Sequence, residues 1–234
     1  MHDLTETIRT EGFAFLHADA MRTALERFGP LTDWNPFAAS WDDLGTDTYM
    51  ADGGRYRKRR HAVFQVSGPV VERLPPRPHY QSRDYNQLNG GIERWFQPVL
   101  PTIGSSASHT SILRFCSELF GALTPAPSWF VEMHQFRIEA RTGEIARPTP
   151  EGMHRDGVDH VLVLLIGRRN VRSGETSVHD LTGRTLGSFT LTEPLDAALV
   201  EDRRVMHGVT PVEPMDPASV GYRDVLVVTF KREG

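Results

Sequence analysis

Two histidines and one aspartate in the C-terminal half of the chain have the types and spacing that could bind a metal ion. His154 and Asp156 stand two positions apart, so their side chains point to the same side if the segment is extended. His207 lies far downstream, and a fold that brings it back would complete a set of three ligands. Two imidazoles and one carboxylate on one face of an ion suit Fe(II) and leave the opposite face open. The sequence therefore predicts a mononuclear metal site at His154, Asp156 and His207.

Spacing alone does not distinguish this triplet, because His17 and Asp19 have the same spacing. There, Asp19 is explained as the cap of a following helix. The triplet at 154–156 differs in its setting: it lies within the Pro- and Gly-flanked segment 148–157 (PTPEGMHRDG), which precedes a long apolar run. The alternative interpretation is a hydrogen-bonded loop triplet and an unrelated strand histidine.

Short runs typical of β-strands, separated by Gly, Pro, Asn and Asp, fill the C-terminal half. They span residues 129–138, 158–166, 175–180, 186–191, 197–201, 206–212 and 225–230. The absence of helical patterns between them favours a sandwich or jelly roll over a parallel α/β fold. We expect an α+β fold, in which a double-stranded β-helix (jelly roll, cupin-like) carries a helical N-terminal half packed on it.

The length of 234 residues suits one domain, residues 1–234. We expect residues 1–124 to be mainly helical support and pocket walls, and residues 125–234 to form the jelly-roll core with the metal site. Strands are predicted at 12–16 and 62–66, and helices after Asp19 and at 108–120. Another helix is predicted after residues 85–91, because Ile92, Trp95, Phe96 and Val99 recur at helical spacing.

The composition is that of an ordinary soluble protein. The hydrophobic fraction of 39%, the charged fraction of 24% and the net charge of -4 favour neither nucleic acid nor an anionic membrane as a partner. Cys116, the one cysteine, excludes an intrachain disulfide and a Cys-based zinc site, whereas ten histidines leave room for a His/carboxylate site. No targeting or membrane-spanning segment is evident. We expect a cytoplasmic protein that acts on a small molecule.

An iron centre that activates oxygen also needs a source of two electrons, and 2-oxoglutarate is such a cosubstrate. Its distal carboxylate requires a cation on a neighbouring strand. Arg223, at the start of the last predicted strand, is the candidate, because a planar guanidinium can bind a carboxylate through two hydrogen bonds. Alternatively, Arg223 caps a strand edge or pairs with Asp224. Arg203 and Arg204 are closer to His207, but their turn suits surface ion pairs equally well.

Four segments together resemble the 2-oxoglutarate/Fe(II) dioxygenase family that includes bacterial L-isoleucine 4-hydroxylase and related hydroxylases of free aliphatic L-amino acids. They are residues 148–157, 174–176, 201–211 (EDRRVMHGVTP) and 221–230 (GYRDVLVVTF). The resemblance implies Fe(II) at His154, Asp156 and His207, and 2-oxoglutarate at Arg223. One departure is Ser173, where a second glycine before Gly174 is expected.

The substrate-binding residues are predicted less directly. Alternation in the strand at 129–138 sends inward either His134 and Phe136 or Gln135 and Arg137. An inward Gln135 and Arg137 would hold the polar end of an amino acid. Arg155, Tyr85 and Arg57 are further candidates. The alternatives are that Arg155 pairs with a nearby group and that the basic run containing Arg57 is a solvated strand edge.

The leading hypothesis is hydroxylation of a free aliphatic L-amino acid or a similar small molecule, with succinate and CO2 as coproducts. A second hypothesis is a non-catalytic metal- or ligand-binding barrel that regulates stress or biofilm behaviour. A third is a nucleic-acid demethylase that binds single strands through the basic run at 55–60 (RYRKRR).

Overall fold

The computed structural model describes residues 1–233. Its helices are α1 (His2–Glu11), α2 (Ala18–Glu26), α3 (Trp34–Ala39), α4 (Pro101–Gly104) and α5 (Ala107–Leu123), with a 3-10 turn η1 (Ser40–Asp43). The strands of the first half are β1 (Phe13–Leu16), β2 (Gly45–Thr46), β3 (Arg57–Ser67) and β4 (Val70–Arg73). The strands of the second half are β5 (Trp129–Ala140), β6 (His160–Arg169), β7 (Val171–Ser173), β8 (Glu175–Asp180), β9 (Thr185–Thr190), β10 (Ala197–Glu201), β11 (Val205–Val209), β12 (Val212–Pro214) and β13 (Gly221–Arg232).

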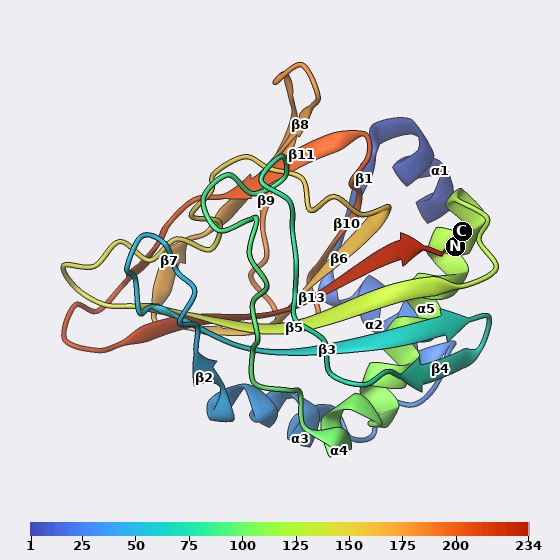
Figure 1. Ribbon diagram of the computed structural model, residues 1–234, viewed down its shortest axis with the longest axis horizontal. Helices are drawn as coiled ribbons and strands as arrows, with labels where there is room; N and C mark the ends of the chain where they lie inside the picture. Colours follow the sequence, from blue (N-terminus) through green and yellow to red (C-terminus); the bar gives the residue numbers. More distant parts are fainter. Residues whose placement is uncertain (234) are drawn as a thin grey trace.

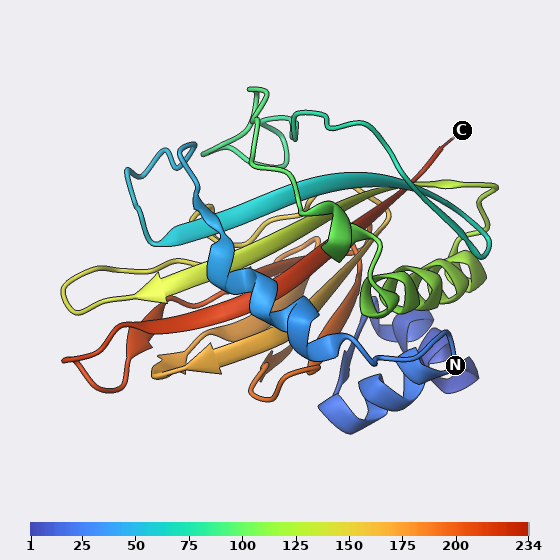
Figure 2. The ribbon, with the colours of Figure 1, turned by 90° about the horizontal axis from the view of Figure 1, so that it is seen from below.

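A main sheet runs through the whole molecule in the order β1-β10-β6-β13-β5-β3-β2, with β4 paired to β3. All its described pairings are antiparallel. Helices cover one face of this sheet, and the smaller sheets β11-β8-β9 and β12-β7 lie on the other side (Figures 1 and 2). The α+β jelly roll predicted from the sequence is therefore confirmed. The first half of the chain contributes strands to this sheet as well as helices.

The central strands of the main sheet separate a hydrophobic side from a polar one. Val131 and Met133 of β5 are fully buried in the cluster that contains the apolar residues of α5. Alternate residues of a strand point to opposite faces, so Glu132 and His134 lie on the other face, where they line a cavity. One strand thus both anchors the helices and carries polar groups to the interior of the jelly roll.

Several predicted elements agree closely with the structure. The helix predicted at 108–120 is α5, whose N-cap Ser106 accepts a hydrogen bond from the backbone N–H of His109. The strands predicted at 175–180 and 197–201 have the bounds of β8 and β10. The helix predicted after residues 85–91 was wrong. Its backbone instead pairs with other segments: the N–H of Val99 donates to the carbonyl of His61 in β3, and His79 and Arg94 exchange two hydrogen bonds in an isolated bridge.

Within residues 1–233, no helix is both long and apolar enough to cross a membrane.

Candidate active site

His154 and His207 face one another in a short antiparallel bridge. The backbone N–H of His154 donates to the carbonyl of His207 at 3.0 Å, and the N–H of His207 donates to the carbonyl of His154 at 2.9 Å. Directly opposed residues of an antiparallel pair project to the same face, and the two ring centroids lie 4.6 Å apart. β11 carries His207, and the loop that leads into β6 carries His154. The fold thus unites two histidines that the sequence separates.

The Asp156 carboxylate lies beside both rings. Its Oδ1 is 3.7 Å from Nε2 of His154, and its Oδ2 is 3.7 Å from Nε2 of His207. One ligand atom from each of the three residues lies within 4.8 Å of the others. Such separations suit three groups that share one ion at bond lengths of about 2.0 to 2.2 Å. The predicted residues therefore form one site that fits a divalent metal ion.

A hydrogen bond of the His154 ring directs one of its nitrogens toward the candidate metal position. Nδ1 of His154 donates to the carbonyl of Gly152 at 3.0 Å, which directs its Nε2 toward Asp156. Burial would lower the pKa of His154, but Asp156 and Glu151 raise it to about 9, so a metal ion would displace a proton from Nε2. Burial lowers the pKa of His207 to about 4, which keeps this ring neutral at physiological pH. Burial would raise the pKa of Asp156, but the neighbouring histidines lower it to about 2. Asp156 is therefore ionised and can bind a cation.

Arg223 lies at the other side of a cavity of about 110 Å³, here called the Arg223 cavity. Its other lining residues include His154, Asp156, His207, Ile138, Thr149, Val163, Val209 and Val225. Only 2% of Arg223 is exposed, and within residues 1–233 its Nε and Nη2 have no hydrogen-bond partner. Burial lowers its pKa to about 10, so the guanidinium keeps its charge at neutral pH. A buried, unpaired guanidinium is costly without an anion, and a carboxylate bound in this cavity would satisfy it.

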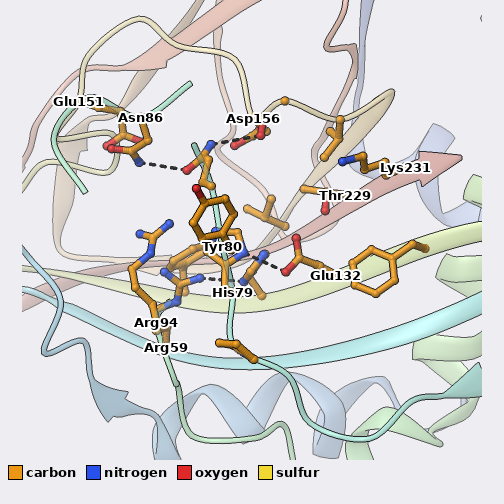
Figure 3. A pocket seen from close by; sticks show the side chains of 18 of the residues that line it. Arg59, His79, Tyr80, Asn86, Arg94, Glu132, Glu151, Asp156, Thr229 and Lys231 are labelled. Carbon is orange, nitrogen blue, oxygen red and sulfur yellow. Dashed lines mark hydrogen bonds and ion pairs between the residues drawn. The ribbon is translucent and has the colours of Figure 1, made fainter. Parts of the chain in front are cut away.

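A second cavity of about 300 Å³ adjoins the first and is here called the Arg94 cavity (Figure 3). The two share the lining residues Arg57, Phe136, Glu151, Asp156 and Val227. Asp156 therefore stands between the two cavities, one containing Arg223 and the other lined by polar groups that include Glu132 and Arg94. This arrangement provides room for a cosubstrate and a second small molecule at one metal site.

The predicted substrate residues are distributed over different surfaces. Arg57 lines both cavities and forms an ion pair of 2.8 Å with Asp47. Arg155 lies over the ring of Tyr85, with 5.3 Å from its Cζ to the ring centroid, and both line a surface hollow next to His154. Neither of these two is among the lining residues of the Arg94 cavity.

Gln135 and Arg137 project from the face of β5 that is turned away from both cavities. Nε2 of Gln135 donates to the hydroxyl of Ser40 at 2.8 Å. Arg137 donates to both oxygens of Asp224 at 2.7 Å. Of the two alternation patterns that the sequence allowed, the structure thus has His134 and Phe136 pointing inward. We accordingly leave Gln135 and Arg137 out of the proposed substrate site.

Two residues of the Arg94 cavity had no place in the sequence-based site. Glu132 shares the alternation of His134 and Phe136, so the strand pattern contained a signal for it. Arg94 lies in the segment whose apolar residues wrongly predicted a helix, and no feature of the sequence singled it out.

Comparison with known proteins agrees with this geometry. A family model described as 2OG-Fe dioxygenase matches residues 38–229. The chain is 25% identical, over 99% of its length and 96% of the relative, to 3(1)-hydroxy-L-isoleucine 4-dioxygenase of Pantoea ananatis. It is also 27% identical to L-isoleucine-4-hydroxylase of Bacillus thuringiensis, over 65% of this chain and 64% of that protein.

Solved structures share the fold. A crystal structure described as a BsmA homologue from Methylobium petroleophilum has a TM-score of 0.91 at 38% identity, covering 100% of this chain and 93% of that one. IDO from Bacillus thuringiensis has a TM-score of 0.79 at 18% identity, covering 99% and 95% of the two chains. These similarities confirm the resemblance that the sequence motifs carried.

Proposed function

Because the chain belongs to the 2OG-Fe dioxygenase family, we propose that it hydroxylates a free aliphatic L-amino acid. The reaction would convert substrate, O2 and 2-oxoglutarate into hydroxylated amino acid, succinate and CO2. The protein is an oxidoreductase that uses Fe(II) and 2-oxoglutarate. When bound, iron and cosubstrate together supply the oxidising power that an unactivated C–H bond requires.

The observation that carries the proposal is the position of Arg223 relative to the three metal ligands. His154, Asp156 and His207 would hold Fe(II), and Arg223 lines the same small cavity with an unpaired guanidinium. A bidentate ion pair between Arg223 and the distal carboxylate of 2-oxoglutarate would fix both the position and the orientation of the cosubstrate.

The remaining walls would restrict water. Val163, Val209 and Val225 line the Arg223 cavity and present apolar side chains beside the polar ligands. Excluding water strengthens the electrostatic interactions inside a site and suppresses side reactions. The adjoining Arg94 cavity, with Asp156 in its lining, would receive the substrate.

The choice of amino acids as the substrate class is supported by the names of two relatives, both of which act on isoleucine or a hydroxyisoleucine. It is also supported by the mixture of cationic and anionic side chains in the Arg94 cavity, since a free amino acid carries both charges at neutral pH.

The test is a succinate assay on purified protein with Fe(II), ascorbate and 2-oxoglutarate, offered each proteinogenic L-amino acid in turn. We expect succinate and a hydroxylated product with at least one aliphatic amino acid. The variant His207→Ala should lose both products. If the protein binds Fe(II) and 2-oxoglutarate but turns over none of the amino acids, the proposed substrate class is wrong.

A further inference from the structure

Arg94 is a buried cation without a counterion among the described residues. Only 2% of the residue is exposed, it lines the Arg94 cavity, and its Nε and Nη2 have no hydrogen-bond partner within residues 1–233. Its neighbour Arg57 is paired with Asp47. Leaving a buried guanidinium unpaired costs free energy that an anionic ligand would recover. This group is therefore suited to a carboxylate that enters the cavity.

The backbone of Arg94 is fixed opposite that of His79. The N–H of His79 donates to the carbonyl of Arg94 at 2.9 Å, and the N–H of Arg94 donates to the carbonyl of His79 at 3.0 Å. Residues opposed in this way direct their side chains to one face, and both line the Arg94 cavity. In Figure 3, Arg94 and Glu132 project on either side of His79 and Tyr80.

Glu132 supplies the opposite charge. Nδ1 of His79 lies 2.9 Å and Nε2 of His61 lies 3.1 Å from the same oxygen, Oε1, so that Oε2 stays available for a ligand. Burial would raise the pKa of Glu132, but its interactions with His79 and His61 hold it below its ordinary value. The cavity thus presents an ionised carboxylate and an unpaired guanidinium.

The same histidines could suggest a second metal site, since His61, His79, Glu132 and His134 have ligand atoms within 4.8 Å of one another. The hydrogen bonds of the cluster argue against a metal ion there. Nη2 of Arg59 lies 2.8 Å from Nδ1 of His134 and takes up that lone pair, because a guanidinium can only donate. Nδ1 of His79 and Nε2 of His61 both face Oε1 of Glu132, which as a carboxylate oxygen can only accept, so these two nitrogens carry protons and have no lone pair for a metal.

We infer that Arg94 binds the α-carboxylate and Glu132 the α-ammonium group of a zwitterionic amino acid. This inference rests on the proposed function and names the residues that would make the free amino acid, rather than a peptide or an amine, its substrate. Each group would form a charge-assisted hydrogen bond, the stronger class of such contacts. His61 and His79 orient the Glu132 carboxylate through their hydrogen bonds to Oε1.

The experiment measures binding to protein loaded with Fe(II) and 2-oxoglutarate, by calorimetry without oxygen. The probes are the best amino acid of the succinate screen and its two truncated analogues. For L-isoleucine these are 3-methylpentanoate, which lacks the amine, and 2-methylbutylamine, which lacks the carboxylate. We expect the unmodified protein to bind each analogue about 10- to 100-fold more weakly than the amino acid.

The variants separate the two roles. Arg94→Leu should weaken binding of the amino acid about 10- to 100-fold and remove the preference over the amine analogue. Glu132→Gln should remove the preference over the acid analogue instead. Arg83→Leu, which changes an exposed arginine of the same segment, should bind all probes as the unmodified protein does. A loss of stability alone would not produce these selective effects.

Other results would overturn the inference. The assigned roles are excluded if Arg94→Leu still prefers the amino acid over the amine analogue, or if Glu132→Gln still prefers it over the acid analogue. They are also excluded if Glu151→Gln, at another carboxylate of the same cavity, removes the preference over the acid analogue and Glu132→Gln does not. Two metal ions per chain in place of one would assign the histidine cluster to a metal. If the protein binds Fe(II) and 2-oxoglutarate but no amino acid, the proposed function fails and this inference fails with it.

Discussion

Oδ1 of Asp202 accepts a hydrogen bond of 2.8 Å from the backbone N–H of Asp156. Its other oxygen, Oδ2, accepts from the N–H groups of Gly157 at 2.8 Å and Val158 at 3.1 Å. Only 1% of Asp202 is exposed. One buried carboxylate thus fixes the backbone that carries the proposed metal ligand Asp156, although Asp202 itself lies outside the proposed ligand set.

We predict that Asp202→Ala weakens Fe(II) binding about 10- to 100-fold, because outer groups that orient metal ligands typically contribute this much. Asp202→Asn should also weaken binding, since its amide NH2 would meet backbone N–H donors. A metal titration monitored by calorimetry measures the effect, with circular dichroism to establish folding. Asp19→Ala, at an exposed position of α2, serves as the control. Normal metal affinity in folded Asp202→Ala would contradict the prediction.

Whether Arg223 binds 2-oxoglutarate or stabilises the fold can be decided by measuring both the KM for the cosubstrate and the Tm. Arg223→Leu should raise the KM for 2-oxoglutarate about 10- to 100-fold, as expected for loss of a charge-assisted pair. Because Arg223 Nε and Nη2 have no protein partner within residues 1–233, its removal should leave Tm unchanged or higher. The KM of Arg223→Lys for 2-oxoglutarate should lie between those of the unmodified protein and Arg223→Leu, since an ammonium group cannot form two parallel hydrogen bonds to a carboxylate as a guanidinium does. A large fall in Tm with unchanged KM would assign Arg223 to the fold.

The candidate metal site could be predicted because two of its three residues are close together in the sequence. His154 and Asp156 are two residues apart, and His207 follows several strands with clear turns between them. β8 and β10 were also predictable, since short runs bounded by turn residues indicate strands. The position of Arg223 was predictable for the same reason, because it stands at the start of the last such run.

Other features depend on contacts between distant segments. Ile92 and Trp95 have helical spacing, yet they are 48% and 57% exposed, and the backbone around them pairs with His61 and His79. Such backbone pairing overrides the local helical spacing, and it produces no pattern of its own in the sequence. Arg94 is positioned by these long-range hydrogen bonds, so its burial in a cavity was not predictable from neighbouring residues.

Ser173 stands where the family resemblance suggested glycine, and its backbone explains the preference. Its φ is 62°, a left-handed conformation that disfavours residues with a Cβ. The side chain is exposed. We predict that Ser173→Gly stabilises the protein by up to about 1 kcal/mol, because relief of strain exceeds the extra chain entropy of glycine. Urea denaturation measures this. Ser67→Gly, at an exposed position of β3, should be destabilising, and a destabilised Ser173→Gly would contradict the explanation.

A buried histidine in α5 makes the stability of the protein depend on pH. Nδ1 of His109 donates to the carbonyl of Gly104 at 2.9 Å, while Nε2 is buried without a partner within residues 1–233. Protonation would therefore create a buried cation beside Phe64. Burial lowers the pKa of His109 from 6.5 to about 4.

In the unfolded chain, His109 takes up a proton below pH 6.5, whereas the folded protein resists it until about pH 4. The unfolded state thus binds more protons in this window, and stability falls as the pH is lowered. We predict that His109 alone accounts for a loss of about 2 kcal/mol between pH 7.5 and 5. Urea denaturation at both pH values measures it: His109→Asn should reduce the pH dependence by that amount, and His2→Asn, at an exposed position, should not. An unchanged pH dependence in His109→Asn would show that other groups are responsible.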